Sequence, residues 1–152
     1  GCGLIIPDCL DGCTVLDLGK KCGFMDLRLV KSNRIEINNK KLEEKTEGID
    51  FYSATYRLFK LNELESDCED YGQAVIYKGN IKNNKNSFIL DNHHIIETDK
   101  VFPVCGNTWN MLKETRFQEH FKFIGNFNKH YGIFDDCGKS IPFEENNLGS
   151  YC

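Results

Sequence analysis

Alternation of apolar and polar residues in the middle of the chain is the feature that most constrains its fold. In residues 51–60 the apolar side chains fall on one face of an extended segment and the polar side chains fall on the other, which predicts a strand. Shorter apolar stretches predict further strands at 27–37, 73–77 and 87–90. The polar stretch 78–86 is expected to join the last two strands as a hairpin.

Near the C-terminal third the apolar spacing changes to three and four residues, from Trp109 to Ile124. This spacing predicts a helix with one apolar face, and Asn107 or Thr108 can cap its start. A capping-box pattern begins at Thr115, so a break is expected there. The large aromatic side chains of this segment (Trp109, Phe117 and Phe121) are interpreted as core rather than as an aromatic cage.

Two stretches on either side of these elements are expected to be irregular. The acidic residues of 61–71 predict a solvated boundary between two parts of the chain. The last stretch, 126–152, has no clear apolar period and is expected to be a loop-like tail. A chain of 152 residues suits one ordinary domain or two small ones, and the predicted strands and helix together indicate a mixed α and β chain.

Residues 14–19 predict a short buried strand that ends at a glycine turn. A hydrophobic strand that ends in Asp17-Leu18-Gly19 is how nucleotide-type folds begin their first strand–loop–helix unit. The repeated glycines and the amphipathic helix of such a unit do not follow, because the next residues are Lys20-Lys21-Cys22-Gly23. These residues alone therefore favour a plain strand and turn.

Charge and hydropathy exclude two classes of partner. The net charge is −4 and the basic residues form no stripe, so the electrostatic footprint of a nucleic-acid-binding protein is absent. No apolar run approaches the roughly 20 residues of a membrane helix. A globular protein that binds neither nucleic acid nor membrane is expected.

The chain has eight cysteines, which fit either a disulfide framework or reduced thiols. Eleven phenylalanines and six tyrosines can build a core without disulfides, so reduced thiols in the cytoplasm are favoured. Thiolates suit soft ions such as copper(I) or trivalent arsenic, although the sequence does not show that three of them converge. A metal site at Asp91, His93 and His94 is disfavoured, because adjacent histidines on a strand point to opposite faces.

Several blocks of the sequence together resemble animal-type arsenite methyltransferases. They occur in the family's order at residues 1–7 with 13–19, 22–24 with 28–30, 51–60, 73–79 and 112–117. The most specific block is Ser53-Ala54-Thr55-Tyr56-Arg57-Leu58-Phe59-Lys60. The resemblance covers most of the chain up to about Gly125.

The resemblance implies an α/β chain, α+β as it stands. Residues 1–62 would be an incomplete class I methyltransferase core, a Rossmann-like remnant with strands 1, 6 and 7 only. Residues 63–152 would be a small α+β C-terminal domain. By residue, the family pattern assigns Asp17 and Gly19 to S-adenosylmethionine and Cys13 to the metalloid. A second metalloid cysteine of the family falls at Met25, whose thioether cannot replace a thiolate.

The sequence passes from Gly19 directly to a segment that resembles the approach to strand 6, so most of the cofactor pocket is missing. A central strand without neighbours leaves its backbone groups unpaired, at about 1–3 kcal/mol for each buried group. The N-terminal part is therefore expected to refold or stay disordered.

The chain is expected to be inactive, although the resemblance implies methyl transfer from S-adenosylmethionine to thiol-bound trivalent arsenic. Its expected partners are arsenite or methylated arsenicals, held by thiols, and thiol reductants. Alternatives are a non-catalytic, thiol-rich fragment that binds metalloids or another protein, and a product of an erroneous or unstable transcript.

Overall fold

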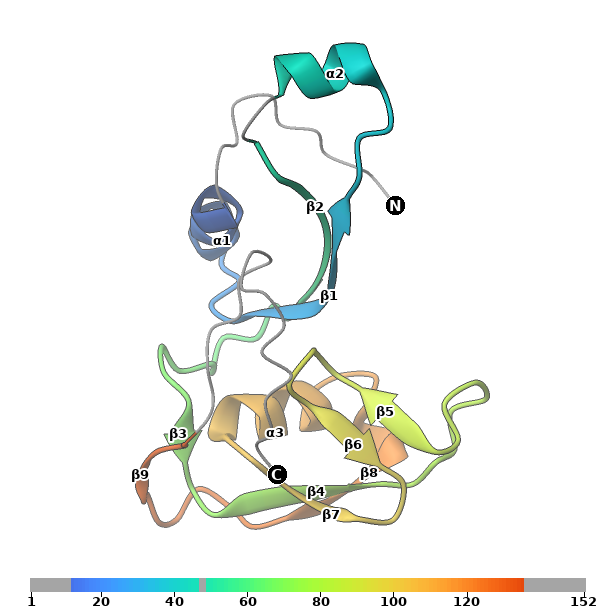
Figure 1. Ribbon diagram of the computed structural model, residues 1–152. Coiled ribbons are helices and arrows are strands. Elements are labelled where there is room, and N and C mark those ends of the chain that lie inside the picture. Colours follow the sequence, from blue (N-terminus) through green and yellow to red (C-terminus); the bar gives the residue numbers. More distant parts are fainter. Residues whose placement is uncertain (1–11, 47–48, 136–152) are drawn as a thin grey trace.

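The computed structural model describes residues 12–46 and 49–135 (Figure 1). The elements in chain order are α1 (Gly12–Lys21), β1 (Leu27–Ile35), α2 (Lys40–Lys45), β2 (Phe51–Leu58), β3 (Glu69–Asp70), β4 (Gln73–Tyr77), β5 (Ser87–Ile89), β6 (Ile95–Glu97), β7 (Val101–Val104), α3 (Gly106–Lys113), a 3-10 turn (Gln118–His120), β8 (Phe121–Ile124) and β9 (Gly132–Ile133). In these residues no helix is long and apolar enough to cross a bilayer.

The C-terminal half is built on a three-stranded antiparallel sheet in the order β7-β4-β8. The central strand pairs Val75 with Phe102 on one side and with Phe123 on the other. Alternate residues of β4 point to one face, where Val75 and Tyr77 enter the core. The helix α3 packs against β4 and β8. The buried core members are Phe59, Leu64, Val75, Tyr77, Phe88, Leu90, Ile96, Val104, Trp109, Met111, Leu112, Phe117 and Phe121.

The predicted hairpin between β4 and β5 is wrong, although both strands are present. The strand β4 pairs with β7 and β8, and β5 pairs with β6. Tyr77 and Phe88 still meet in the core, with ring centroids 5.7 Å apart. The sequence analysis missed the partner strands β6 and β7 because each is only three or four residues long.

Only the first five residues of the predicted helix of 109–124 are α-helical, within α3. The helix α3 ends at Lys113, near the break expected at Thr115, whose hydroxyl donates to the carbonyl of Met111 at 2.6 Å. The rest of the segment forms a 3-10 turn and then β8. Phe121 and Phe123 alternate around Lys122 and pair with β4, so tertiary pairing overrides the helical spacing.

The predicted strand at residues 14–19 is also wrong, because these residues lie inside the helix α1. The helix ends in a Schellman motif in which the amides of Gly23 and Phe24 donate to the carbonyls of Lys20 and Gly19, at 2.9 and 3.0 Å. Gly23 has a φ of +86°, as the motif requires. A helix satisfies its own backbone groups, whereas no strand in the described part of the chain lies where it could pair with the predicted strand.

The strands β1 and β2, which the sequence predicts as strands but not as a pair, form a separate antiparallel hairpin with a bulge between Leu29 and Lys31. The short helix α2 lies at the far end of this hairpin, and the sheet of the C-terminal half lies at its other end (Figure 1). Asn39 caps α2 by accepting from the amides of Lys41 and Leu42, at 3.0 and 3.3 Å.

The acidic stretch 61–71 is only partly the solvated boundary that its charge predicts. Leu64 is buried in the core, and the amide of Glu65 donates to the side chain of Asn107 at 2.8 Å. The end of the stretch enters β3, which pairs with β9 in the segment expected to be a tail. The remaining tail, 136–152, lies outside the described residues.

Candidate functional site

The three residues that the resemblance assigns to cofactor and metalloid lie on α1. Cys13 is the second residue of this helix, and its side chain lies outside the described part. Asp17 is exposed to solvent. A Cβ added at Gly19 would lie 2.6 Å from the side chain of Leu27, so the helix approaches β1 closely at this glycine. The assigned roles stay predictions.

The residues present do not fit S-adenosylmethionine. A nucleotide-type loop needs free backbone N–H groups between a strand and the start of a helix. Here Asp17 and Gly19 lie within the last two turns of α1, and the Gly19 carbonyl accepts from the amides of Cys22 and Phe24. The described segment therefore offers the C-terminal end of a helix where the cofactor would need the N-terminal end.

The described cysteines do not form a shared soft-ion site. Cys22 is exposed and Cys105 is buried, and both are free of disulfides. Cys13 and Cys22 are nine positions apart, so the helical rise between them is about 13–14 Å. Two sulfurs on one ion lie within about 4.6 Å of each other, twice a typical metal–sulfur bond of about 2.3 Å. Cys22 therefore cannot join Cys13 on one arsenic atom while α1 is intact.

Cys68 corrects the expectation that the cysteines are reduced thiols, because it is disulfide-bonded. Cysteines in the interior behave as small hydrophobic residues or as cross-links, and this chain contains both kinds. Among the described residues, no three histidine, cysteine, aspartate or glutamate side chains are grouped to hold a metal ion.

The most structured polar site is a buried ion network where β1 meets the C-terminal half. Its centre is Arg28, which donates to Asp26 at 2.8 Å and to Asp91 at 3.2 Å. Burial alone would lower the pKa of the Arg28 guanidinium, but Asp26 beside it, together with Cys105 and Asp91, raises it above its usual value. The positive charge is therefore fixed in the interior.

Asp91 links Arg28 to the turn that contains His93 and His94. Its Oδ1 accepts from the amides of His93 and His94, at 2.9 and 2.8 Å, and from Nδ1 of His94 at 2.7 Å. Burial alone would raise the pKa of Asp91, but the hydrogen bond and charge of His94 and the charge of Arg28 hold it well below its usual range. His94 therefore binds the Asp91 carboxylate through both its ring and its backbone amide, whereas His93 binds it through its backbone amide.

Two residues at the start of α3, its N-cap Cys105 and Asn107, extend the network. Cys105 is the N-cap of α3, where its sulfur accepts from the amide of Thr108 at 3.5 Å and from Arg28 at 3.9 Å. Asn107 donates to Asp26 at 3.3 Å and to the carbonyl of Glu65 at 2.9 Å. These bonds connect the start of β1, the 61–71 stretch and α3. The network therefore holds the hairpin in a fixed position relative to the C-terminal half.

Sequence reasoning missed this network because its partners are far apart in the chain. Arg28 and Asp91 are separated by 63 positions, and Arg28 and Cys105 by 77. The local signal was Asp91 ahead of His93 and His94, since aspartate side chains bind the backbone amides that follow them. The sequence analysis considered these three residues only as a metal site, which it disfavoured, and did not consider the turn.

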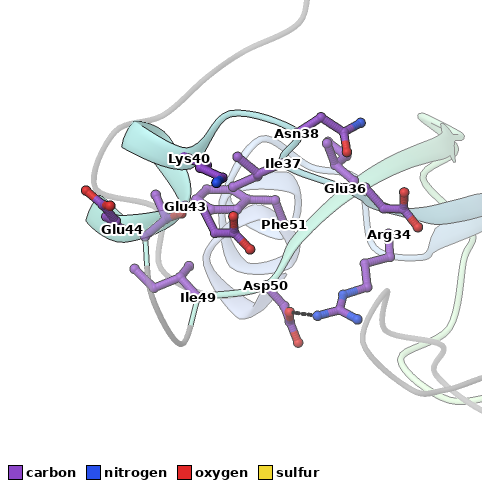
Figure 2. A pocket seen from close by; sticks show the side chains of 12 residues that line it. Arg34, Glu36, Ile37, Asn38, Lys40, Glu43, Glu44, Ile49, Asp50 and Phe51 are labelled. Atoms are coloured by element: carbon purple, nitrogen blue, oxygen red, sulfur yellow. Dashed lines mark hydrogen bonds and ion pairs between the residues drawn. The ribbon is translucent and has the colours of Figure 1, made fainter.

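A shallow hollow lies at the far end of the hairpin, between the strand ends and α2. Its lining includes Ile37, Ile49 and Phe51, with charged side chains around them (Figure 2). Arg34 and Asp50 form an exposed ion pair at its edge. None of the described residues that line the hollow is a buried polar group, so the hollow resembles a contact surface more than a catalytic pocket.

Comparisons with known proteins place these features in a family. A family model described as the arsenite methyltransferase C-terminal domain matches residues 71–145. The arsenite methyltransferase of Aquipseudomonas alcaligenes is 52% identical over 145 residues, which cover 93% of this chain and 42% of that protein. The arsenite methyltransferase of Homo sapiens is 34% identical over 106 residues, which cover 68% of this chain and 27% of that protein.

A solved structure agrees with this similarity. It is the crystal structure of CrArsM, an arsenic(III) S-adenosylmethionine methyltransferase from Chlamydomonas reinhardtii. It matches with a TM-score of 0.77 and 39% identity, over 82% of this chain and 42% of that chain. This chain thus spans about two-fifths of the length of both the algal protein and the bacterial relative.

Proposed function

Because this chain belongs to the arsenite methyltransferase family, we propose that it is a partial arsenite methyltransferase that supplies the C-terminal region and does not transfer methyl groups alone. The observation that carries the proposal is the match of the C-terminal domain model to residues 71–145 in a chain that covers 42% of its bacterial relative. The similarity to the algal crystal structure also supports a mixed α and β fold for the C-terminal region.

The complete reaction would move a methyl group from S-adenosylmethionine to trivalent arsenic held by thiolates. Two features of the chain support its inability to perform this reaction. The predicted cofactor residues Asp17 and Gly19 lie toward the end of a helix, and the exposed thiol of Cys22 lies too far along α1 from Cys13 to share an ion. We therefore expect arsenite to be the substrate of the complete enzyme and, at the cysteines that the structure describes, a ligand of one thiol at most.

The test is a methylation assay with the purified full chain, S-adenosylmethionine, arsenite and a thiol reductant. We expect no methylated arsenic above a protein-free control, because the chain does not hold cofactor and metalloid in line. The complete bacterial relative, assayed in the same buffer, is the positive control. Methylated arsenic that grows in proportion to the concentration of the chain would overturn the proposal.

The non-catalytic alternative has two versions, and the structure favours one of them. The metalloid version needs converging thiols, and Cys22 and Cys105 differ in exposure and position. The protein-interaction version is supported by apolar side chains that lie exposed on the hairpin, such as Ile35 and Phe51. We propose the cytoplasm as the location of the chain and thiol reductants as further partners, because methyl transfer to thiol-bound arsenic needs reduced thiols. The disulfide bond of Cys68 is the observation that opposes a reducing compartment.

A further inference from the structure

Two arginines lie beside the ring of the buried Phe117, where the hairpin meets the C-terminal half. The guanidinium carbon of Arg57, on β2, is 5.6 Å from the centre of this ring, and that of Arg116 is 5.1 Å from it. Arg57 also lies 5.5 Å from the centre of the Phe88 ring. Aromatic rings attract cations but do not replace the hydrogen-bond acceptors that the N–H groups of an arginine need.

Arg57 has a free edge of hydrogen-bond donors. Its Nη1 donates to the carbonyls of Ile89 and Leu90. Its Nε and Nη2 make no hydrogen bond or ion pair with any residue that the structure describes. Neither nitrogen is enclosed, because the buried side-chain nitrogens without a partner in the described residues belong to Gln73 and Trp109. The free edge of Arg57 is therefore accessible to solvent.

The cross-strand partner of Arg57 shows what such an edge binds. This partner is Arg28, whose Nε and Nη2 donate to the two carboxylate oxygens of Asp26, both at 2.8 Å. The planar fork of a guanidinium matches a group with two oxygens in this way. Arg57 presents the same fork from the adjacent strand, but within the described parts of the chain no carboxylate occupies the equivalent position.

The charges around Arg57 do not balance. Burial and the charge of Arg116 lower the pKa of Arg57, whereas the charge of Asp91 raises it and has the smaller effect. Asp91 is already bound by Arg28 at 3.2 Å and by the ring of His94 at 2.7 Å. Arg116 is exposed and forms no ion pair with another described residue. An anion beside Arg57 and Arg116 would offset the repulsion between their charges.

We propose that Arg57 and Arg116 form a binding site for a small oxyanion that presents two oxygens to one guanidinium edge, either a carboxylate or a phosphate group. Arg57 supplies the fork, which two backbone carbonyls and the rings of Phe88 and Phe117 hold in position. Arg116 supplies a second positive charge from an exposed side chain. The site uses neither S-adenosylmethionine nor arsenic, so it goes beyond the proposed function.

The test is nuclear magnetic resonance of the full chain, titrated separately with sodium phosphate and sodium acetate at an ionic strength held constant with sodium chloride. The readout is the Nε–H resonance of Arg57, which is assigned by its loss in the Arg57→Lys variant. We expect this resonance to shift and saturate with at least one of the two anions. Saturation with acetate identifies a carboxylate site, and saturation with phosphate identifies a phosphate site.

Two variants make the titration specific. Arg116→Gln should raise the dissociation constant at least roughly tenfold, because it removes a charged donor from the ligand. The matched control is Arg34→Gln, which alters an exposed arginine that already has Asp50 as a partner and should bind as the wild type does. No saturable shift with either anion, a shift that sodium chloride alone reproduces, or equal dissociation constants for Arg116→Gln and Arg34→Gln would each overturn the proposal.

Discussion

Replacing Asp91 by alanine is expected to lower the free energy of unfolding by about 3–5 kcal/mol, because it leaves the Arg28 charge buried and short of a partner. The carboxylate also organises its own turn through the amides of His93 and His94. Urea unfolding of the full chain, followed by far-ultraviolet circular dichroism, measures the change. We expect a lower transition midpoint with a similar slope.

The matched control is Asp50→Ala, which breaks the exposed ion pair with Arg34. Surface ion pairs are screened by water and contribute little, so the control should leave the urea midpoint nearly unchanged. Equal midpoints for Asp91→Ala and Asp50→Ala would show that the Arg28 network does not hold the hairpin in place.

The same network predicts a direction for acid sensitivity. Because the pKa of Asp91 is depressed in the folded state, its stabilising contribution is complete above its unfolded pKa of about 3.9. The contribution is lost as the pH falls from that value through the lower, folded-state pKa. Below about pH 4 the stability difference between wild type and Asp91→Ala should therefore shrink. A difference that is constant from pH 7 to pH 2 would contradict the assignment.

Replacing Phe88 by alanine should destabilise the C-terminal half by about 3–5 kcal/mol, as expected for removal of a large buried ring. Its ring lies 5.0 Å from Phe117 and 5.3 Å from Phe121, in edge-to-face contacts, and Arg57 lies over its face. Thermal unfolding followed by near-ultraviolet circular dichroism reports the loss of this aromatic packing.

The neighbouring residue gives the control for this prediction. Ile89 lies next to Phe88 in β5, but its side chain is exposed. Ile89→Ala should therefore change the melting temperature far less than Phe88→Ala does. Similar melting temperatures for the two variants would mean that the aromatic cluster is not the core of this half.

Secondary structure and core residues could be predicted from the sequence where the local residue pattern agrees with the tertiary contacts. The strands β2 and β4 follow from the residues themselves, since apolar side chains alternate in the one and β-branched and aromatic residues fill the other. The residues Trp109, Phe117 and Phe121 were correctly interpreted as core. The resemblance added the family, and the comparisons confirm it.

The failures occur where distant contacts decide the local structure. Phe121 and Phe123 continue a helical spacing, yet pairing with β4 makes them a strand. Residues 14–19 contain a strand-like run, but no described strand pairs with them, and the Lys20-Lys21-Cys22-Gly23 segment ends a helix instead. That Lys-Lys-x-Gly signal was visible in the sequence and predicts a helix C-terminus.

Most of the structured site could not be predicted from the sequence. Arg28 lies on β1, Asp91 in the loop between β5 and β6, and Cys105 directly before α3, and no spacing rule connects them. The division into residues 1–62 and 63–152 stays a prediction, although the family model begins within the second part, at residue 71. The Asn107 bonds to Asp26 and Glu65 show that the two parts share polar contacts.

The most direct test of the central claim, that this chain is an arsenite methyltransferase family member without a working cofactor pocket, is calorimetric titration of the full chain with S-adenosylmethionine. The segment that contains Asp17 and Gly19 is a helix that ends at Lys21, so we predict no saturable heat of binding at millimolar cofactor. The complete bacterial relative should bind under the same conditions. Saturable binding by this chain, with a stoichiometry near one, would contradict the account.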